Sequence, residues 1–123
     1  MQAVAVYFPS GAYVRAEVAA DQAARQRGLT GRRAVPEDTG MLFDFGRSAP
    51  HRFWMEGTLV PLDMVFFGPD YAVVHVVKSA RPLDRSTYGG RVSSRYVLEV
   101  AGGWVDRHGV TVGQRAAVFR LPT

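Results

Sequence analysis

Two carboxylates in the sequence are embedded in strongly apolar segments. Asp63 lies in Pro-Leu-Asp-Met-Val-Phe-Phe, and Glu99 lies in Tyr-Val-Leu-Glu-Val. A carboxylate in such surroundings must be hydrogen-bonded, ion-paired or protonated, because burying a bare charge is costly. If the two side chains converge, they could serve as the catalytic general acid and base of a hydrolase or lyase. The alternative is that each caps a turn or pairs with an arginine such as Arg27 or Arg33.

A tryptophan supplies a second candidate feature. Trp54 lies between Phe53 and Met55 in a segment of strand character, and in an alternating strand it points away from both neighbours. An exposed tryptophan beside polar groups could be a stacking platform for a sugar or another flat ligand. Packing in the core or in an interface is the alternative interpretation.

Three polar side chains could complete a binding site around this tryptophan. Thr58 lies in the loop before Asp63, where it could orient that carboxylate or a ligand hydroxyl, or simply stabilise the turn. His51 could join Trp54 and Asp63 in a cleft, and Arg27 offers a cation to a ligand. The candidate ligand-binding residues are therefore Arg27, His51, Trp54 and Thr58.

Several other chemistries are excluded by the residue types. The chain has no cysteine, which removes disulfides, thiolate nucleophiles and cysteine-ligated metals. The three histidines form no His-x-His or His-Glu-x-x-His pattern, so no metal site is expected. Neither glycine pair, at 89–90 or 102–103, has the strand–loop–helix context of a phosphate loop, and no cofactor is expected.

Charge and hydropathy bear on partners and location. The formal net charge is +4 and the pI about 10, but the arginines are scattered rather than clustered among aromatic residues, which disfavours a nucleic-acid partner. No apolar stretch reaches the roughly 18–20 residues that cross a bilayer. The first eight residues lack a basic region and a small-residue cleavage site, so no signal peptide is expected. The compartment and the oligomeric state stay open.

Short strands must position the candidate side chains. Apolar or alternating runs bounded by turn residues predict strands over residues 3–8, 13–18, 40–45, 51–55, 64–67, 72–77, 95–100 and 116–121. One helix is expected over 21–27, with Asp21 as its N-cap and Gly28 as its C-cap. The sequence therefore predicts a mainly β, soluble single domain over residues 1–123. Its architecture would be a small antiparallel β-barrel or sandwich-like domain with one short helix near residues 21–28.

Three segments together resemble a known family. The first runs from Arg27-Gly28-Leu29 to Gly40-Met41-Leu42-Phe43, the second from Phe53-Trp54-Met55 through Thr58 to Pro61-Leu62-Asp63, and the third from Tyr96-Val97-Leu98-Glu99 to Gly103. This combination, over residues 14–113, is similar to the domain-of-unknown-function 192 family of uncharacterised bacterial and archaeal proteins.

The resemblance implies a predominantly β fold with little helix, and it implies no established activity. Family members often follow a signal or lipoprotein leader, so the resemblance permits an extracytoplasmic setting. The chain departs from the family pattern at two places. Thr30 stands where methionine is usual, and Glu56-Gly57 stands where Lys-Asn is usual. A ligand bound by that Lys-Asn pair would be bound differently by this protein, or not at all.

The sequence thus predicts a small β domain that binds a small polar, carbohydrate-like ligand in a cleft near Trp54, Asp63 and Glu99. Two alternatives remain open. One is a hydrolase or lyase that uses both carboxylates as acid and base, and the other is a protein-interaction or structural domain. Geometry separates them, because catalysis requires both carboxylates at one open cavity, whereas binding requires only a platform and a few donors.

Overall fold

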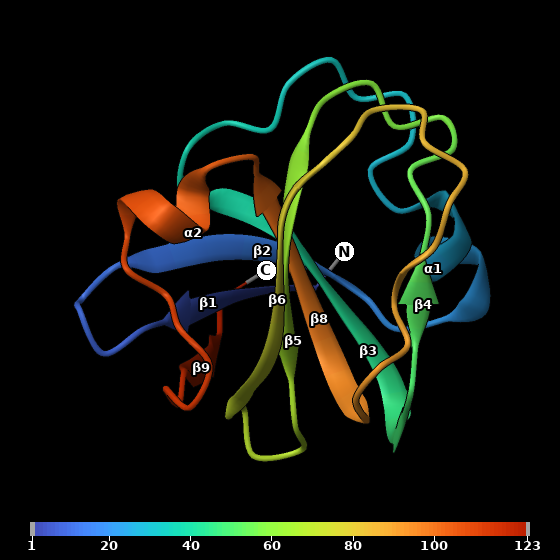
Figure 1. Ribbon diagram of the computed structural model, residues 1–123. Helices are drawn as coiled ribbons and strands as arrows, with labels where there is room; N and C mark the ends of the chain where they lie inside the picture. The colour runs from blue at the N-terminus through green and yellow to red at the C-terminus, as the bar shows by residue number, and fades with distance from the viewer. Residues whose placement is uncertain (1, 123) are drawn as a thin grey trace.

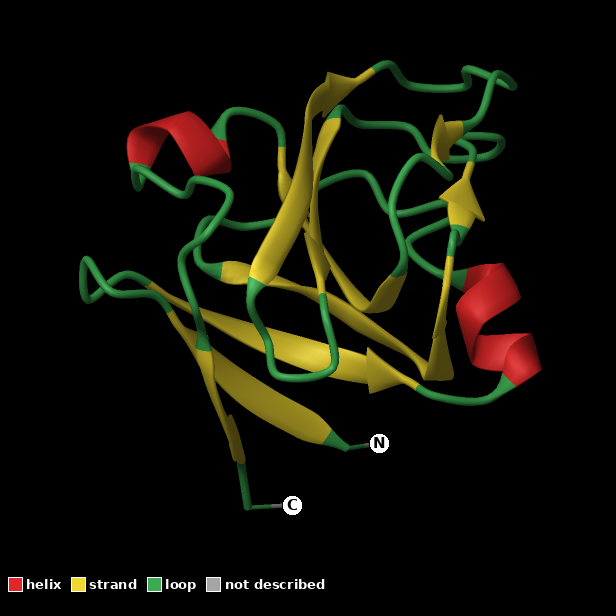
Figure 2. Ribbon diagram, turned by 60° about the horizontal axis from the view of Figure 1, so that its bottom comes forward, coloured by secondary structure: helices red, strands yellow, loops and turns green. Residues whose placement is uncertain are grey.

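The computed structural model describes residues 2–122. Met1 and Thr123, the two ends of the expected domain, lie outside the described residues. Strands dominate the architecture, and the two helices of the described chain are short (Figure 2). The elements are β1 (Ala3–Tyr7), β2 (Tyr13–Ala19), α1 (Gln22–Arg27), β3 (Thr39–Ala49), β4 (Arg52–Phe53), β5 (Leu62–Phe67), β6 (Val73–Ala80), β7 (Tyr88–Gly89), β8 (Ser94–Ala101), α2 (Trp104–Arg107) and β9 (Ala117–Arg120).

Seven strands form one sheet in the order β6-β5-β8-β3-β2-β1-β9, and β4 pairs with β7 in a separate ladder. Neighbouring strands of the large sheet are antiparallel except β2 and β3, which run parallel. A parallel pair needs a crossover connection, and α1 with the segment that follows it supplies one. Figure 1 shows the β1–β2 part of the sheet turned steeply away from the β3, β8, β5 and β6 part.

The predicted mainly β class is confirmed, but the sheet is not closed into a barrel and is not fully antiparallel. The sheet has two edges, β6 and β9, and the adjoining segments meet at a single isolated bridge between Ala72 and Arg115. Tyr71 and Gly113, both with positive φ, bend the chain on either side of this bridge, so the pairing does not grow into a ladder. The prediction of a single helix was also incomplete, because α2 was missed.

The sheet separates two apolar cores. The first core lies inside the bend of the sheet and contains Val4, Val6, Val14, Ala16, Leu42, Val65, Phe67, Leu98, Val100 and Trp104. The second core covers the other face of the central strands and contains Leu29, Met41, Phe43, Met55, Met64, Phe66 and Val97. The central strands β5 and β8 therefore have apolar neighbours on both faces, which explains their nearly continuous hydrophobic sequences.

Local signals explain how α1 begins and ends. The Asp21 carboxylate accepts a hydrogen bond from the Ala24 N–H at 2.8 Å, and Gly28 with φ 46° closes the last turn through its N–H to the Ala24 carbonyl. The predicted caps of this helix are therefore confirmed. Nothing in the described residues forms a helix both long and apolar enough to cross a bilayer.

Candidate functional site

Asp63 is fully buried in β5, and backbone amides satisfy it. Its Oδ1 accepts hydrogen bonds from the N–H groups of Ser79 (2.8 Å) and Gly103 (3.1 Å), and its Oδ2 accepts one from Val105 (2.9 Å). The last two donors belong to the first turn of α2. Asp63 therefore caps α2 and ties β6 to β5, which is the turn-capping alternative that the sequence left open.

Glu99 is also buried, with 5% of its surface exposed, but it points to the other side of the sheet. In the β5–β8 pairing Asp63 lies opposite Val100, whereas Glu99 lies opposite Met64. Directly paired residues share a face and successive residues alternate, so Asp63 faces the first core and Glu99 faces the second. The two carboxylates do not converge, and no single cleft holds both.

The carboxyl group of Glu99 has neither a hydrogen-bond nor an ion-pair partner within residues 2–122. Burial alone raises the pKa of its carboxyl group from 4.5 to about 8. At neutral pH the group is therefore mostly protonated, and a protonated carboxyl can donate one hydrogen bond and accept others. The predicted alternative in which Arg27 or Arg33 pairs with a carboxylate is not seen for either Asp63 or Glu99 in the described chain.

Glu99 opens onto a cavity of about 750 Å³. Such a volume suits a small organic ligand. The sheet contributes Phe43, Phe45 and Glu99, and α1 with the residues after it contributes one wall; Figure 1 shows α1 and β4 on the same side of β3. The full lining consists of Gln22, Arg25, Gln26, Arg27, Gly28, Leu29, Thr30, Phe43, Phe45, Arg52, Phe53, Trp54, Glu56, Gly57, Thr58, Thr87 and Glu99.

Four of the six candidate side chains from the sequence line this cavity, namely Arg27, Trp54, Thr58 and Glu99. Trp54 is 53% exposed, whereas Thr58 is buried. The predicted strand at 51–55 is reduced to β4, so Trp54 lies just beyond it, and its neighbour Met55 enters the second core. Trp54 is thus available as a flat surface at the cavity rather than packed in the core.

Two candidate side chains lie elsewhere. Asp63 belongs to the other face of the sheet and is not part of the lining. His51 is not part of it either, because its ring stacks on Phe45 with 3.7 Å between centroids and its Nε2 lies 3.1 Å from the Arg47 carbonyl oxygen. The structure therefore does not bring His51 into the lining of the cavity.

Sequence reasoning missed the other polar residues of the lining, among them Gln22, Arg25, Gln26 and Arg52. The i, i+3, i+4 spacing of Gln22, Arg25 and Gln26 is that of one helix face. These three residues could therefore have been found by asking which side chains share a face of the predicted helix. Arg25 is held in place by the carbonyl oxygens of Ala20 and Asp44 and lies over the Phe45 ring, 5.4 Å from its centroid. Arg52 carried no such signal.

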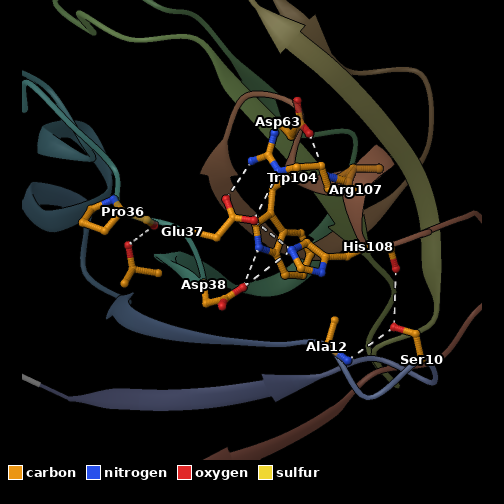
Figure 3. A network of polar contacts seen from close by, with 11 residues as sticks. Ser10, Ala12, Pro36, Glu37, Asp38, Asp63, Trp104, Arg107 and His108 are labelled. Atoms are coloured by element: carbon orange, nitrogen blue, oxygen red, sulfur yellow. Dashed lines mark hydrogen bonds and ion pairs between the residues drawn. The ribbon is translucent and has the colours of Figure 1, made fainter.

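A second polar cluster joins the loop before β3 to α2 (Figure 3). Arg107 Nη2 donates to Glu37 at 2.7 Å, His108 Nε2 lies 2.9 Å from the same carboxylate, and Trp104 Nε1 donates to Asp38 at 3.0 Å. The hydrogen bond from Arg107, and then that from His108, lowers the pKa of Glu37 to about 2. One oxygen or nitrogen atom from each of Glu37, Asp38 and His108 lies within 4.8 Å of the others, a spacing that could hold a metal ion. Both carboxylates already accept hydrogen bonds from Trp104, Arg107 and His108, however, so we interpret the cluster as an ion-pair network.

The chain matches the family model DUF192, described as "Uncharacterized ACR", over residues 6–118. One similar solved structure is a "putative transcription regulator" from Sinorhizobium meliloti 1021, 36% identical, with a TM-score of 0.87 over 95% of this chain and 92% of that chain. Another is a protein of unknown function from Novosphingobium aromaticivorans DSM 12444, 31% identical, with a TM-score of 0.86 over 94% of this chain and 83% of that chain. No curated protein matches the chain. The resemblance seen in the sequence is therefore confirmed, and the chain belongs to the DUF192 family.

Proposed function

We propose that this protein binds a small polar, carbohydrate-like ligand in the cavity that Glu99 and Trp54 line. The observation that carries the proposal is that Glu99 is buried and unpartnered in the described chain, yet borders a space large enough for a ligand. A carboxyl group that has no protein partner and faces a cavity is available to hydrogen-bond a ligand or ordered water.

The rest of the lining fits such a ligand. Trp54 offers one exposed aromatic face, and the pyranose face of a sugar packs well on such a surface. The Thr58 hydroxyl and the carboxyl of Glu99 can each donate and accept, as ring hydroxyls require. Phe43 and Phe53 add apolar surface to the same lining. Apolar walls with a few placed polar groups are the usual make-up of a small-molecule site.

Two other functions are less well supported. A hydrolase or lyase with Asp63 and Glu99 as acid and base would need both groups at one bond, and the two lie on opposite faces of the sheet. The similar structure from S. meliloti is described as a "putative transcription regulator", so we also consider DNA binding. The helices of the described chain, however, span six and four residues, which is short for a recognition helix that fills the major groove. Sensing of a small molecule is compatible with a regulatory role.

The proposal is tested by mapping ligand contacts with two-dimensional 1H–15N NMR on the wild-type protein, using a panel of monosaccharides and polyols. We expect shifts to concentrate at Phe53, Trp54 and Gly57, and we expect Trp54→Ala to weaken binding about tenfold through loss of stacking. The matched control is Phe119→Ala, which removes an exposed aromatic side chain outside the cavity. The proposal fails if binding shifts fall elsewhere, or if both substitutions weaken binding equally.

A further inference from the structure

We propose that the ligand of this cavity carries an anionic group, a carboxylate or a phosphate, that Arg27 and Arg52 hold while its uncharged part extends toward Glu99. The inference rests on the proposed function and names the chemical class of the ligand. It follows from the charges along the cavity wall, from the pairing of arginines elsewhere in the chain, and from how the cavity arginines are held.

The cavity wall carries an excess of positive charge. Arg25, Arg27 and Arg52 are cations of the lining, and Glu56 and Glu99 are its only acidic residues among those described. Glu56 is already neutralised, because Arg85 donates to its Oε1 through both Nε, at 3.0 Å, and Nη2. Glu99 is uncharged at neutral pH because burial raises its pKa to about 8. No negative charge within the lining therefore offsets the three arginines.

Arginines elsewhere in the chain commonly have a carboxylate partner. Ion pairs join Arg32 to Glu17, Arg81 to Asp84, Arg85 to Glu56, Arg95 to Asp44, Arg107 to Glu37 and Arg115 to Asp70. Within residues 2–122, Arg25, Arg27 and Arg52 form no ion pair. Other arginines, such as Arg33, are also without a carboxylate, but they do not line this cavity. An anionic ligand would supply the partner that the three cavity arginines lack.

The cavity arginines are partly positioned before any ligand arrives. Arg25 is fixed by two backbone carbonyl oxygens and by the Phe45 ring. The Arg52 side chain lies directly against Gly90, where an added Cβ would come within 2.5 Å of its Nε. Guanidinium groups hold carboxylates and phosphates through paired N–H donors, and a positioned group loses less entropy on binding. Arg27, in the last turn of α1, makes no side-chain hydrogen bond or ion pair within residues 2–122.

An uncharged Glu99 is also compatible with an anionic ligand. An ionised carboxylate inside the cavity would repel a second negative charge, whereas a carboxylic acid donates a hydrogen bond to a ligand hydroxyl or carbonyl. The cavity thus offers cations from α1 and β4 and an uncharged donor from the sheet. A sugar acid or a sugar phosphate has the two corresponding parts.

The test uses matched probes that differ mainly in charge: glucose against glucuronate, glucose against glucose 6-phosphate, and benzamide against benzoate. Dissociation constants come from 1H–15N NMR titrations followed at Phe53, Trp54 and Gly57. We expect at least one anionic probe to bind about tenfold more tightly than its neutral partner, as a charge-assisted hydrogen bond would give. The glucuronate pair tests for a carboxylate ligand, and the glucose 6-phosphate pair tests for a phosphate ligand.

Substitutions assign the charge preference to the cavity. Arg27→Gln and Arg52→Gln should each remove most of the preference for the anionic probe, and Arg33→Gln, an exposed arginine outside the lining, should leave it unchanged. Equal binding of neutral and anionic probes would overturn the inference and leave the proposed function standing, as would an anion preference that survives both cavity substitutions. Absence of any shift at the three reporter amides with all probes would refute the inference and the proposed function together.

Discussion

Replacing Glu99 by glutamine should stabilise the protein at alkaline pH and leave its stability nearly unchanged at acid pH. The pKa of the Glu99 carboxyl is raised from 4.5 in the unfolded chain to about 8 in the folded protein. Between these two values the folded protein keeps a proton that the unfolded chain has released. The free energy of unfolding therefore falls as pH rises through this window, and the loss is complete above pH 8. Glutamine keeps the shape and does not titrate, so the variant escapes this loss.

The magnitude follows from the size of the pKa change. The pKa of Glu99 rises by about 3.5, and each pKa unit is worth roughly 1.4 kcal/mol. The free energy of unfolding should therefore fall by roughly 5 kcal/mol above pH 8. That is a large part of the 5–15 kcal/mol that stabilises a typical domain. Water or a cation that enters the cavity beside the ionised carboxylate would reduce the figure.

The assay is urea unfolding of wild type and Glu99→Gln at pH 5, 7 and 9, with the free energy taken by linear extrapolation. Subtracting the two curves cancels every other titrating group. The matched control is Glu56→Gln, a half-buried carboxylate of the same cavity that pairs with Arg85. Its change should stay within about 1 kcal/mol at each pH, as for other exposed pairs. A wild-type minus Glu99→Gln difference that is the same at pH 5 and pH 9 would refute the reasoning, because it would mean that Glu99 does not titrate differently on folding.

Three further substitutions probe the fold and the cavity by urea unfolding. Asp63→Asn should cost about 3–5 kcal/mol, since an amide nitrogen would face one of the three backbone N–H groups that now donate hydrogen bonds to the carboxylate; a loss below 1 kcal/mol would contradict its capping role. Gly40→Ala should cost about 2–3 kcal/mol because its Cβ would overlap the Glu99 carbonyl oxygen. An unchanged urea midpoint would contradict this, because it would mean that β8 moves aside at little cost. Trp54→Ala should change stability by no more than about 0.5 kcal/mol, since the side chain is 53% exposed; a large loss would mean that Trp54 supports folding rather than binding.

Much of the local structure was visible in the sequence. Alternation over residues 13–18 puts Val14, Ala16 and Val18 on one face, and the structure places Val14 and Ala16 in the first core with Val18 partly buried against it. The N-cap at Asp21 and the C-cap at Gly28 were read correctly because capping depends on residues within one turn. The residues of β8 also alternate, which puts Glu99 on the face of Val97 and away from that of Leu98, and the two cores agree.

The relation between Asp63 and Glu99 could not be predicted in the same way. Each strand alternates by itself, but whether two strands present their carboxylates to one face depends on the register between them. Met64 lies opposite Glu99 in the observed pairing, and a shift by one residue would have brought Asp63 there instead. Nothing local to either strand encodes that choice.

The second helix was missed for a related reason. The sequence reads Gly102-Gly103 as a break, and a four-residue helix has little stability of its own. Its first turn is held by the carboxylate of Asp63, about forty residues earlier in the chain. Helix and cap become neighbours only after β5 and β8 have paired.

By itself, the sequence determined the family, the mainly β class and four of the residues that line the cavity, because apolar periodicity, turn residues and motif spacing are local properties. The tertiary structure decided which of those residues meet. Strand register sent Asp63 to the cap of α2 and Glu99 to the cavity, and the parallel crossover between β2 and β3 set α1 with Arg25 and Arg27 beside Trp54. Contacts between distant segments depend on pairing and packing of the whole chain. For this reason the sequence suggested an acid–base pair of two carboxylates, whereas the structure has a single buried acid in a cavity lined with arginine.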